Sequence, residues 1–255
     1  MARLPLVGSL AAEERWGWLL SQLKESKTVS LGEAADALGV SEMTVRRDFS
    51  AMEAEGIARR VRGGAVYTGP VSFSGRERSF AAEKAVIAEK LLPRVPRSGV
   101  IAMDSSTTMH RLAQAIGAMD DLTVVTNGLT TFQALQDKPG VTAILTGGAK
   151  DRRSDSLVGP VATAFLESMR FACFFASAAA IDANGCYEDT LEEAEIKRAF
   201  VRSSARVLIG AHAAKLDDHA TAAAVQLENI SVLATELPPT DPTIVPYARL
   251  VTTVL

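Results

Sequence analysis

The sequence is poor in cysteine. Its two cysteines, Cys173 and Cys186, are too few for a disulfide framework, and both lie in or beside apolar sequence, where a buried free thiol is expected. The amino terminus lacks the apolar stretch and the small-residue cleavage site of a signal peptide. Together these absences predict a cytoplasmic protein in a reducing compartment.

Long hydrophobic runs are also missing. The longest apolar stretch, FACFFASAAAI, extends from Phe171 to Ile181 and is far shorter than the roughly 18 residues that a membrane-spanning helix requires. We interpret this stretch as a buried strand. A membrane partner is therefore not expected.

Sequence signatures of catalytic or metal sites are equally scarce. None of the three histidines, His110, His212 and His219, is spaced with cysteine or carboxylate residues in the way that metal ligands are. A G-x-S-x-G nucleophile elbow and a Walker A loop are both absent. We therefore expect no metal, no cofactor and no catalytic residues, and predict that the protein is not an enzyme.

An excess of positive charge is lacking too, because 27 lysine and arginine residues against 30 aspartate and glutamate residues leave a net charge of −3. Any contact with nucleic acid must then come from a local patch. The apolar content of 47% and the charged content of 22% are typical of a globular protein. A chain of 255 residues is long enough for two domains of unequal size.

Apolar residues recur with helical spacing in three segments near the amino terminus. They are Trp16, Leu19, Leu20 and Leu23 in the first segment, Leu31, Ala34, Ala35 and Leu38 in the second, and Val45, Phe49 and Met52 in the third. Gly39 ends the second pattern, and Ser41 is suited to cap the third helix. Three short helices with a glycine turn predict a helix-turn-helix.

The third helix has the polar residues that a recognition helix needs at its start and off its core face. We expect contacts with double-stranded DNA from Ser41, Glu42, Thr44, Arg46, Arg47 and Ser50. Arginine side chains suit guanine edges and phosphates, and Thr44 can meet a thymine methyl group or a phosphate.

A second basic element follows this helix. Residues 57–66 contain three arginines and no acidic residue, and Gly63-Gly64 marks a turn, which predicts a small hairpin, the wing of a winged helix. We expect Arg59, Arg60 and Arg62 to reach phosphates or the minor groove. Residues 1–66 carry nine basic and nine acidic residues, so the positive charge is local to the helix and wing.

The stretch VSEMTVRRDFSAMEAEGIARRVRGGAV closely resembles the DNA-binding signature of the DeoR family of bacterial transcriptional regulators, from Val40 to Ala65. The resemblance implies that this helix and wing bind operator DNA. We predict a winged helix-turn-helix domain at residues 1–68 and, because residues 67–80 are rich in Gly, Ser and Pro, a linker at residues 69–80.

Residues 81–255 are predicted to form a larger α/β domain. Apolar strand-like runs such as GVIAMD, LTVVTN, VTAILTGG and RVLIGA alternate with helical stretches, which indicates a mostly parallel sheet covered on both faces. Ligands bind to such sheets where the strands end and the next helices begin. We expect an effector-binding site there.

The residues that follow these strands are of the types that a phosphorylated sugar requires, namely hydroxyl, carboxylate, carboxamide, glycine and lysine. They are Asp104, Ser105, Ser106, Thr107, Thr108, Thr126, Asn127, Gly128, Gly147, Gly148 and Lys215. We add Glu193 and Lys197 from LEEAEIKRAF, although a pair with this spacing also serves simply to support a helix.

The resemblance to DeoR-type regulators extends over this domain, in elements from Asp104 to Thr108, at Thr126-Asn127, at Gly147-Gly148, from Glu192 to Lys197 and at Lys215. It implies a fold similar to ribose-5-phosphate isomerase and CoA transferases. It also implies a repressor of a sugar or carbohydrate catabolic operon that a phosphorylated sugar or related metabolite releases from operator DNA. A homodimer or higher homo-oligomer is expected, since one helix recognises an operator weakly.

The sequence departs from the DeoR pattern at Ser106, where glycine is usual, and at His212, Ala213 and Ala214, where aspartate and serines are usual. Either the ligand differs or part of the pocket is degenerate. The alternative function is a sugar-phosphate isomerase-like enzyme with an accessory amino-terminal domain, in which the arginine-rich helix and wing would have no role.

Overall fold

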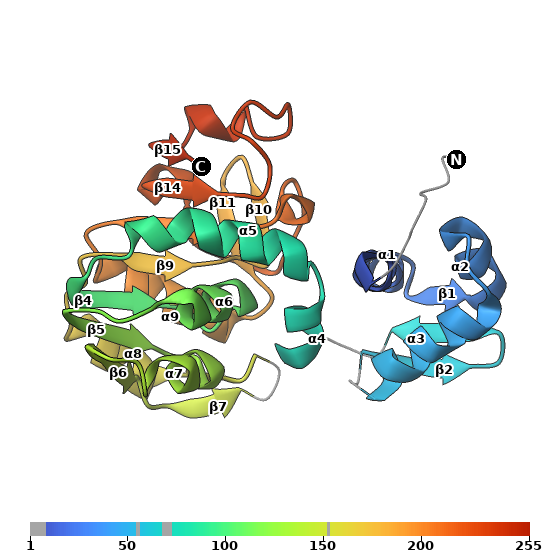
Figure 1. The fold of residues 1–255 in the computed structure, drawn as a ribbon, viewed down its shortest axis with the longest axis horizontal. Helices are drawn as coiled ribbons and strands as arrows, with labels where there is room; N and C mark the ends of the chain where they lie inside the picture. Colours follow the sequence, from blue (N-terminus) through green and yellow to red (C-terminus); the bar gives the residue numbers. More distant parts are fainter. Residues whose placement is uncertain (1–8, 55–56, 68–72, 152–153) are drawn as a thin grey trace. The chain divides into compact units, whose positions relative to one another are not determined.

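The computed structural model describes residues 9–54, 57–67, 73–151 and 154–255, and the chain divides into two units, Met1–Ala81 and Ala82–Leu255 (Figure 1). The elements of the smaller unit are α1 (Ser9–Ser26), β1 (Thr28–Ser30), α2 (Leu31–Leu38), α3 (Glu42–Ala54), β2 (Ala58–Val61), β3 (Gly64–Tyr67) and α4 (Phe73–Arg78). Helices α2 and α3 form the predicted helix-turn-helix.

The core of the smaller unit consists of the apolar residues whose spacing predicted its helices. Every one of these residues is buried, and Leu19, Leu23 and Val45 are fully so. Gly39 ends α2 in the left-handed region, with φ of 65°. The Ser41 hydroxyl accepts a hydrogen bond from the Thr44 N–H at 3.2 Å, as an N-cap does. The predicted helices and their caps are confirmed.

The predicted wing is the antiparallel hairpin of β2 and β3, which turns at Gly63. Strand β1, which the sequence did not suggest, pairs with β3 and gives the order β1-β3-β2. Three residues are too few to show the alternation of a strand. The close pairing requires glycine at position 64, because a Cβ there would lie 2.2 Å from the Val29 carbonyl oxygen.

Helix α4 lies within residues 69–80, which we predicted to be a linker. Six helical residues are too few to produce a recognisable apolar period, and the Gly- and Ser-rich composition concealed them. Residues 69–72 lie outside the described part of the chain.

The larger unit contains the predicted alternation of strands and helices. Its elements are α5 (Ala81–Leu91), β4 (Ser98–Met103), α6 (Thr107–Ala115), β5 (Asp121–Thr126), α7 (Leu129–Leu135), β6 (Val141–Leu145), β7 (Ala149–Asp151), β8 (Ser156–Val158), α8 (Pro160–Glu167), β9 (Phe174–Ala176), β10 (Ala180–Asp182), β11 (Gly185–Glu188), α9 (Leu191–Arg202), β12 (Val207–Gly210), β13 (Ala222–Gln226), β14 (Val232–Ala234) and β15 (Thr253–Val254). Seven of the strands form one sheet in the order β15-β14-β12-β9-β4-β5-β6.

All neighbouring strands of this sheet are parallel, as predicted. Successive residues of β4 enter different cores. Ile101 and Met103 pack with residues of α5, α6 and α7, whereas Ala102 packs with residues of α8 and α9. Helices therefore cover both faces of the sheet, which explains why its strands are almost wholly apolar.

The apolar run from Phe171 to Ile181 is not one strand, and that prediction was wrong. It contains β9 of the parallel sheet and the start of β10, which belongs to a separate antiparallel sheet, β10-β11-β13. The chain leaves the first sheet at Ser177, whose N–H is bound by the Asp104 side chain. Hydrophobicity alone does not mark such a change of sheet.

Both cysteines are free and buried, as expected. Burial raises the pKa of the Cys186 thiol to about 12, so this thiol stays protonated at neutral pH. Within the described residues, every helix is too short or too polar to cross a bilayer.

Candidate functional sites

Helix α3 has one buried face and one exposed, charged face. Val45 and Phe49 lie in the core of the smaller unit, while Arg46 and Arg47 are exposed. The Arg46 guanidinium lies 3.9 Å from the Glu42 carboxylate, and both side chains are more than half exposed. An ion pair so exposed is weak. These arginines remain accessible to a ligand.

The wing adds two more exposed arginines, Arg59 in β2 and Arg62 in the turn that follows it. They flank Arg60, whose side chain is bound to residues of α3. Arg60 Nε donates a hydrogen bond to Glu53 Oε2 at 2.7 Å, and its Nη1 donates to Ser50 Oγ at 2.8 Å. The bound Arg60 guanidinium also lowers the pKa of the Glu53 carboxyl group.

Arg60 and Ser50 were predicted to bind DNA, but their contacts join the wing to the end of α3. Ser50 also donates a hydrogen bond to the Arg46 carbonyl at 2.8 Å. At the other end of the helix, the Ser41 and Thr44 hydroxyl groups lie 3.0 Å apart and bind each other. The geometry favours a positioning role for Arg60 and Ser50.

A second contact, which the sequence analysis did not predict, holds α3 against α1. The Arg15 guanidinium donates two hydrogen bonds to the Asp48 carboxylate, at 2.5 and 3.1 Å, and the two side chains are only 12% and 14% exposed. Asp48 directly follows the two exposed arginines in the sequence. This aspartate therefore holds α3 against α1.

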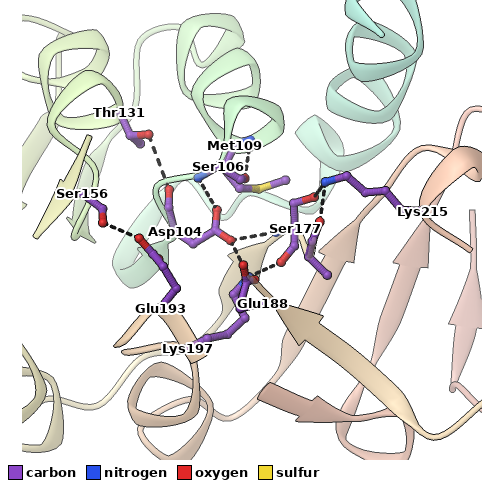
Figure 2. A network of polar contacts seen from close by, with 11 residues as sticks. Asp104, Ser106, Met109, Thr131, Ser156, Ser177, Glu188, Glu193, Lys197 and Lys215 are labelled. Carbon is purple, nitrogen blue, oxygen red and sulfur yellow. Dashed lines mark hydrogen bonds and ion pairs between the residues drawn. The ribbon is translucent and has the colours of Figure 1, made fainter. Parts of the chain in front are cut away.

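The carboxylate of Asp104, at the end of β4, is the centre of a polar network in the larger unit (Figure 2). It accepts hydrogen bonds from the N–H groups of Ser106, at 2.9 Å, and Ser177, at 2.8 Å. It also lies 3.1 Å from Nζ of Lys197, and Asp104 is only 5% exposed. Three donors from three separate segments therefore fix the position of this carboxylate.

Lys197 of α9 contacts two carboxylates at once. Besides Asp104, its ammonium group binds Glu188 of β11 and donates to the Ser177 carbonyl oxygen. Burial by itself would lower the pKa of Lys197, but Glu188 and Asp104 outweigh burial and hold that pKa above its ordinary range. Lys197 is therefore charged and already neutralised, so its geometry suits it to position Asp104.

Ser177 links the two lysines of this network, and the sequence analysis did not select it. Its N–H is bound by Asp104, its carbonyl accepts from Lys197, and its hydroxyl lies 3.1 Å from Nζ of Lys215 (Figure 2). Ser177 is only 1% exposed. The signal that could have identified it is a hydroxyl residue in the middle of the longest apolar run.

Lys215 approaches the network from the turn of 3₁₀ helix after β12, formed by Ala213–Lys215. Its ammonium group donates to the Ser177 hydroxyl and to the Ala178 carbonyl, and the residue is half-buried. The parallel sheet thus brings Asp104, Lys197 and Lys215 together from three distant parts of the sequence.

The hydroxyl of Ser106 caps helix α6 by accepting a hydrogen bond from the Met109 N–H at 3.2 Å. This contact gives the serine at the usual glycine position a structural purpose. Ser105, Thr107 and Thr108 are buried around the same helix start. Among the described residues, the buried Thr108 hydroxyl has no hydrogen-bond partner.

The loop after β5 places Asn127 in the interior with one acceptor unused. Its Nδ2 donates to the Leu157 carbonyl at 3.3 Å, whereas its buried Oδ1 has no hydrogen-bond partner within the described part of the chain. Thr126 Oγ1 accepts from the Gly128 N–H at 3.1 Å. A Cβ at position 128 would lie 2.8 Å from Cα of Ser105, so only glycine lets the two loops approach.

Glu193, Gly147 and Gly148 complete the predicted effector residues. Glu193 accepts a hydrogen bond from the Ser156 hydroxyl at 2.5 Å. Gly147 and Gly148 have positive φ angles of 75° and 114° and lead the chain from β6 into β7. Neither glycine belongs to the network in Figure 2. His212, one of the departures from the family pattern, is buried before the turn that carries Lys215.

Two protein-family models match separate parts of the chain. The DeoR-like helix-turn-helix domain matches residues 15–70, and the DeoR C terminal sensor domain matches residues 79–237. The chain is 29% identical to the HTH-type transcriptional regulator GolR of Listeria innocua, over 88% of this chain and 90% of that protein. It is 27% identical to the glycerol-3-phosphate regulon repressor of Haemophilus influenzae, over 85% of this chain and 86% of that protein.

Among solved structures, ribose 5 phosphate isomerase A from Neisseria gonorrhoeae is similar over 53% of each chain, with 15% identity and a TM-score of 0.35. This score is too low to carry a functional conclusion. The two domain matches cover most of the chain and establish its family.

Proposed function

The chain belongs to the DeoR family of transcriptional regulators, and on that premise we propose that it represses a sugar or carbohydrate catabolic operon. In this proposal, α3 and the wing bind operator DNA. A phosphorylated sugar or a related metabolite binds at the strand ends of the larger unit and lowers the affinity for DNA.

The observation that carries the proposal is the pair of exposed arginines on α3 beside the exposed arginines of the wing. Arg46 and Arg47 occupy the helix, and Arg59 and Arg62 occupy the hairpin that Arg60 fastens to it. A net-negative chain can bind DNA when its cationic groups are concentrated in this way. The helix suits the major groove, and the wing suits the adjacent backbone or minor groove.

For the effector, support comes from the position of the Asp104 network at the ends of β4, β9 and β12. Parallel sheets bind ligands at this edge. The unused acceptor of Asn127 and the unpartnered hydroxyl of Thr108 are buried polar atoms that a sugar hydroxyl would satisfy. Lys215 is placed to meet an anionic group, because it is half-buried and its ammonium group reaches the Ser177 hydroxyl at these strand ends.

The effect on DNA binding follows from linkage. An effector that binds one arrangement of the protein more tightly shifts the population toward that arrangement. If the favoured arrangement binds operator poorly, effector and DNA oppose each other with the same coupling free energy in both directions.

We also propose that the protein has no isomerase activity. A proton-transferring lysine needs a pKa near neutrality, whereas Glu188 and Asp104 hold the pKa of Lys197 high. Incubation with pentose and hexose phosphates should give no conversion between ketose and aldose. Measurable turnover would favour the enzyme alternative.

Operator binding by a single recognition helix is weak, so we propose a homodimer or larger homo-oligomer acting on repeated half-sites. Light scattering on the full chain, alone and with DNA, measures this directly. We place the protein in the cytoplasm, where bacterial operators lie.

A thermal-shift screen against phosphorylated sugars tests the proposed function. A ligand that binds the folded state stabilises it by mass action and raises the melting temperature. Each compound that does so is then added to the protein–DNA complex. Stabilisation together with release of DNA supports the proposal, whereas DNA binding that no stabilising compound alters contradicts the effector part of it.

A further inference from the structure

We propose that Met43 reads the methyl group of a thymine in the operator, an inference that rests on the proposed DNA-binding function. Met43 lies in the first turn of α3, and 55% of its surface is exposed. Recognition helices contact base edges with residues of this part of the helix.

Met43 shares a helix face with the two arginines of α3. Arg46 and Arg47 follow it by three and four residues, so all three side chains project from one side. The buried residues Val45 and Phe49 project from the opposite side. A surface placed against α3 by its arginines would therefore also meet Met43.

The exposure of Met43 matches a pattern within the smaller unit. Among the described residues of this unit, two large apolar side chains are exposed, Met43 at 55% and Val61 at 40%. One lies on the recognition helix and the other on wing strand β2. Both exposed apolar side chains thus lie on the elements that carry the exposed arginines. If these elements bind DNA, the two apolar side chains are removed from water.

The chemistry of the major groove selects the contact. Among the base edges that line this groove, the C5-methyl group of thymine is the apolar feature. The unbranched methionine side chain is flexible and polarisable, which lets it pack against a small apolar group. Met43 would then distinguish thymine from cytosine, while the arginines bind guanine edges and phosphates.

The test removes the methyl group from the DNA. The full chain first selects duplexes from a randomised pool, and each thymine of the selected duplex is then replaced singly by deoxyuridine. Affinities are measured by fluorescence anisotropy for the wild type, Met43→Ala and, as a matched control on the wing, Val61→Ala. Thermal melting confirms that the exposed substitutions leave the fold intact.

We expect deoxyuridine at one or more positions to weaken wild-type binding by about fourfold, the factor that burial of one methyl group gives. Met43→Ala should bind the original duplex as weakly as the wild type binds the deoxyuridine duplex, and deoxyuridine at those positions should not weaken its binding further. Val61→Ala should still lose affinity when deoxyuridine replaces thymine there. An unchanged penalty in Met43→Ala, or none in the wild type, overturns the inference. Failure to select any duplex instead contradicts DNA binding itself.

Discussion

The carboxylate of Asp104 lies 3.1 Å from the ammonium group of Lys197, and both side chains are less than a tenth exposed. The pair joins the end of β4 to α9, and Glu188 adds β11 to the same lysine. Three elements are therefore held in one arrangement by a single cation. A ligand that contacts any member of the network acts on all three, which provides a physical route from the proposed effector site to the rest of the unit.

Replacing Lys197 with methionine should destabilise the larger unit by about 3–5 kcal/mol at pH 7, because it leaves two buried carboxylates without a counter-ion. The loss should be smaller at pH 4.5, because burial raises the pKa of the Glu188 carboxyl group and a protonated Glu188 needs no counter-ion. Urea denaturation of the full chain at both pH values measures the change. The control is Lys138→Met, which removes a lysine bound to the carbonyls of Gln114 and Ile116. Its loss of unfolding free energy should be nearly the same at both pH values.

The unfolding free energy of the wild type should also depend on pH in the alkaline range. The folded-state pKa of Lys197 lies above its ordinary value of 10.5, so its stabilising effect is complete below pH 10.5 and is lost as the pH rises further. The unfolding free energy of Lys197→Met should lack this alkaline component. Parallel alkaline curves for the two proteins would contradict a raised pKa of Lys197 in the folded state.

Replacing Lys215 with methionine should abolish the thermal shift given by a phosphorylated effector, because the variant lacks the cation that would bind the phosphate. Lys215 is half-buried, and its ammonium group donates to the Ser177 hydroxyl and to the Ala178 carbonyl. Lys150→Met removes an exposed lysine paired with Asp155 and should keep the shift. An undiminished shift in Lys215→Met would exclude this lysine from effector binding.

Arg47→Ala should weaken binding to the selected duplex by about 1–3 kcal/mol if Arg47 contacts a base, or reduce the salt-dependence slope by about 1 if it contacts a phosphate. Either result places Arg47 at the interface. Arg249→Ala removes an equal charge from an exposed position in the larger unit and serves as the control. Equal effects of the two substitutions would indicate a loss of general charge attraction only.

Asp48→Ala should destabilise the smaller unit by about 1–3 kcal/mol, because the largely buried Arg15 guanidinium loses two hydrogen bonds. DNA affinity should fall although Asp48 faces the protein interior. The exposed Asp36 of α2 provides the control substitution Asp36→Ala. Urea denaturation should then show an earlier transition for the smaller unit alone, and an unchanged transition would mean that the pair does not hold α3.

The helices of the smaller unit and the parallel sheet of the larger one were predictable because burial imposes a period on the sequence. Val45, Phe49 and Met52 reveal their helix by spacing alone. Contacts between segments have no such period. Nothing near Arg60 in the sequence shows that it binds Glu53 instead of remaining free.

The effector site was predictable in position but not in its internal bonding. Strand ends identify Asp104 and Asn127, because parallel strands place their carboxyl ends at one edge. Ser177 and Glu188 lie on segments that reach this edge only through the change from β9 to the antiparallel sheet. That change depends on tertiary contacts, which no local pattern records.

The most direct test of the account is the affinity of the full chain for its selected duplex, measured by fluorescence anisotropy with and without a saturating compound from the thermal-shift screen. We predict saturable binding that weakens as salt is raised, and a loss of at least about fivefold in affinity when the compound is present, the lower range of allosteric coupling. Saturable binding with the same affinity in the presence and absence of every stabilising compound would contradict it.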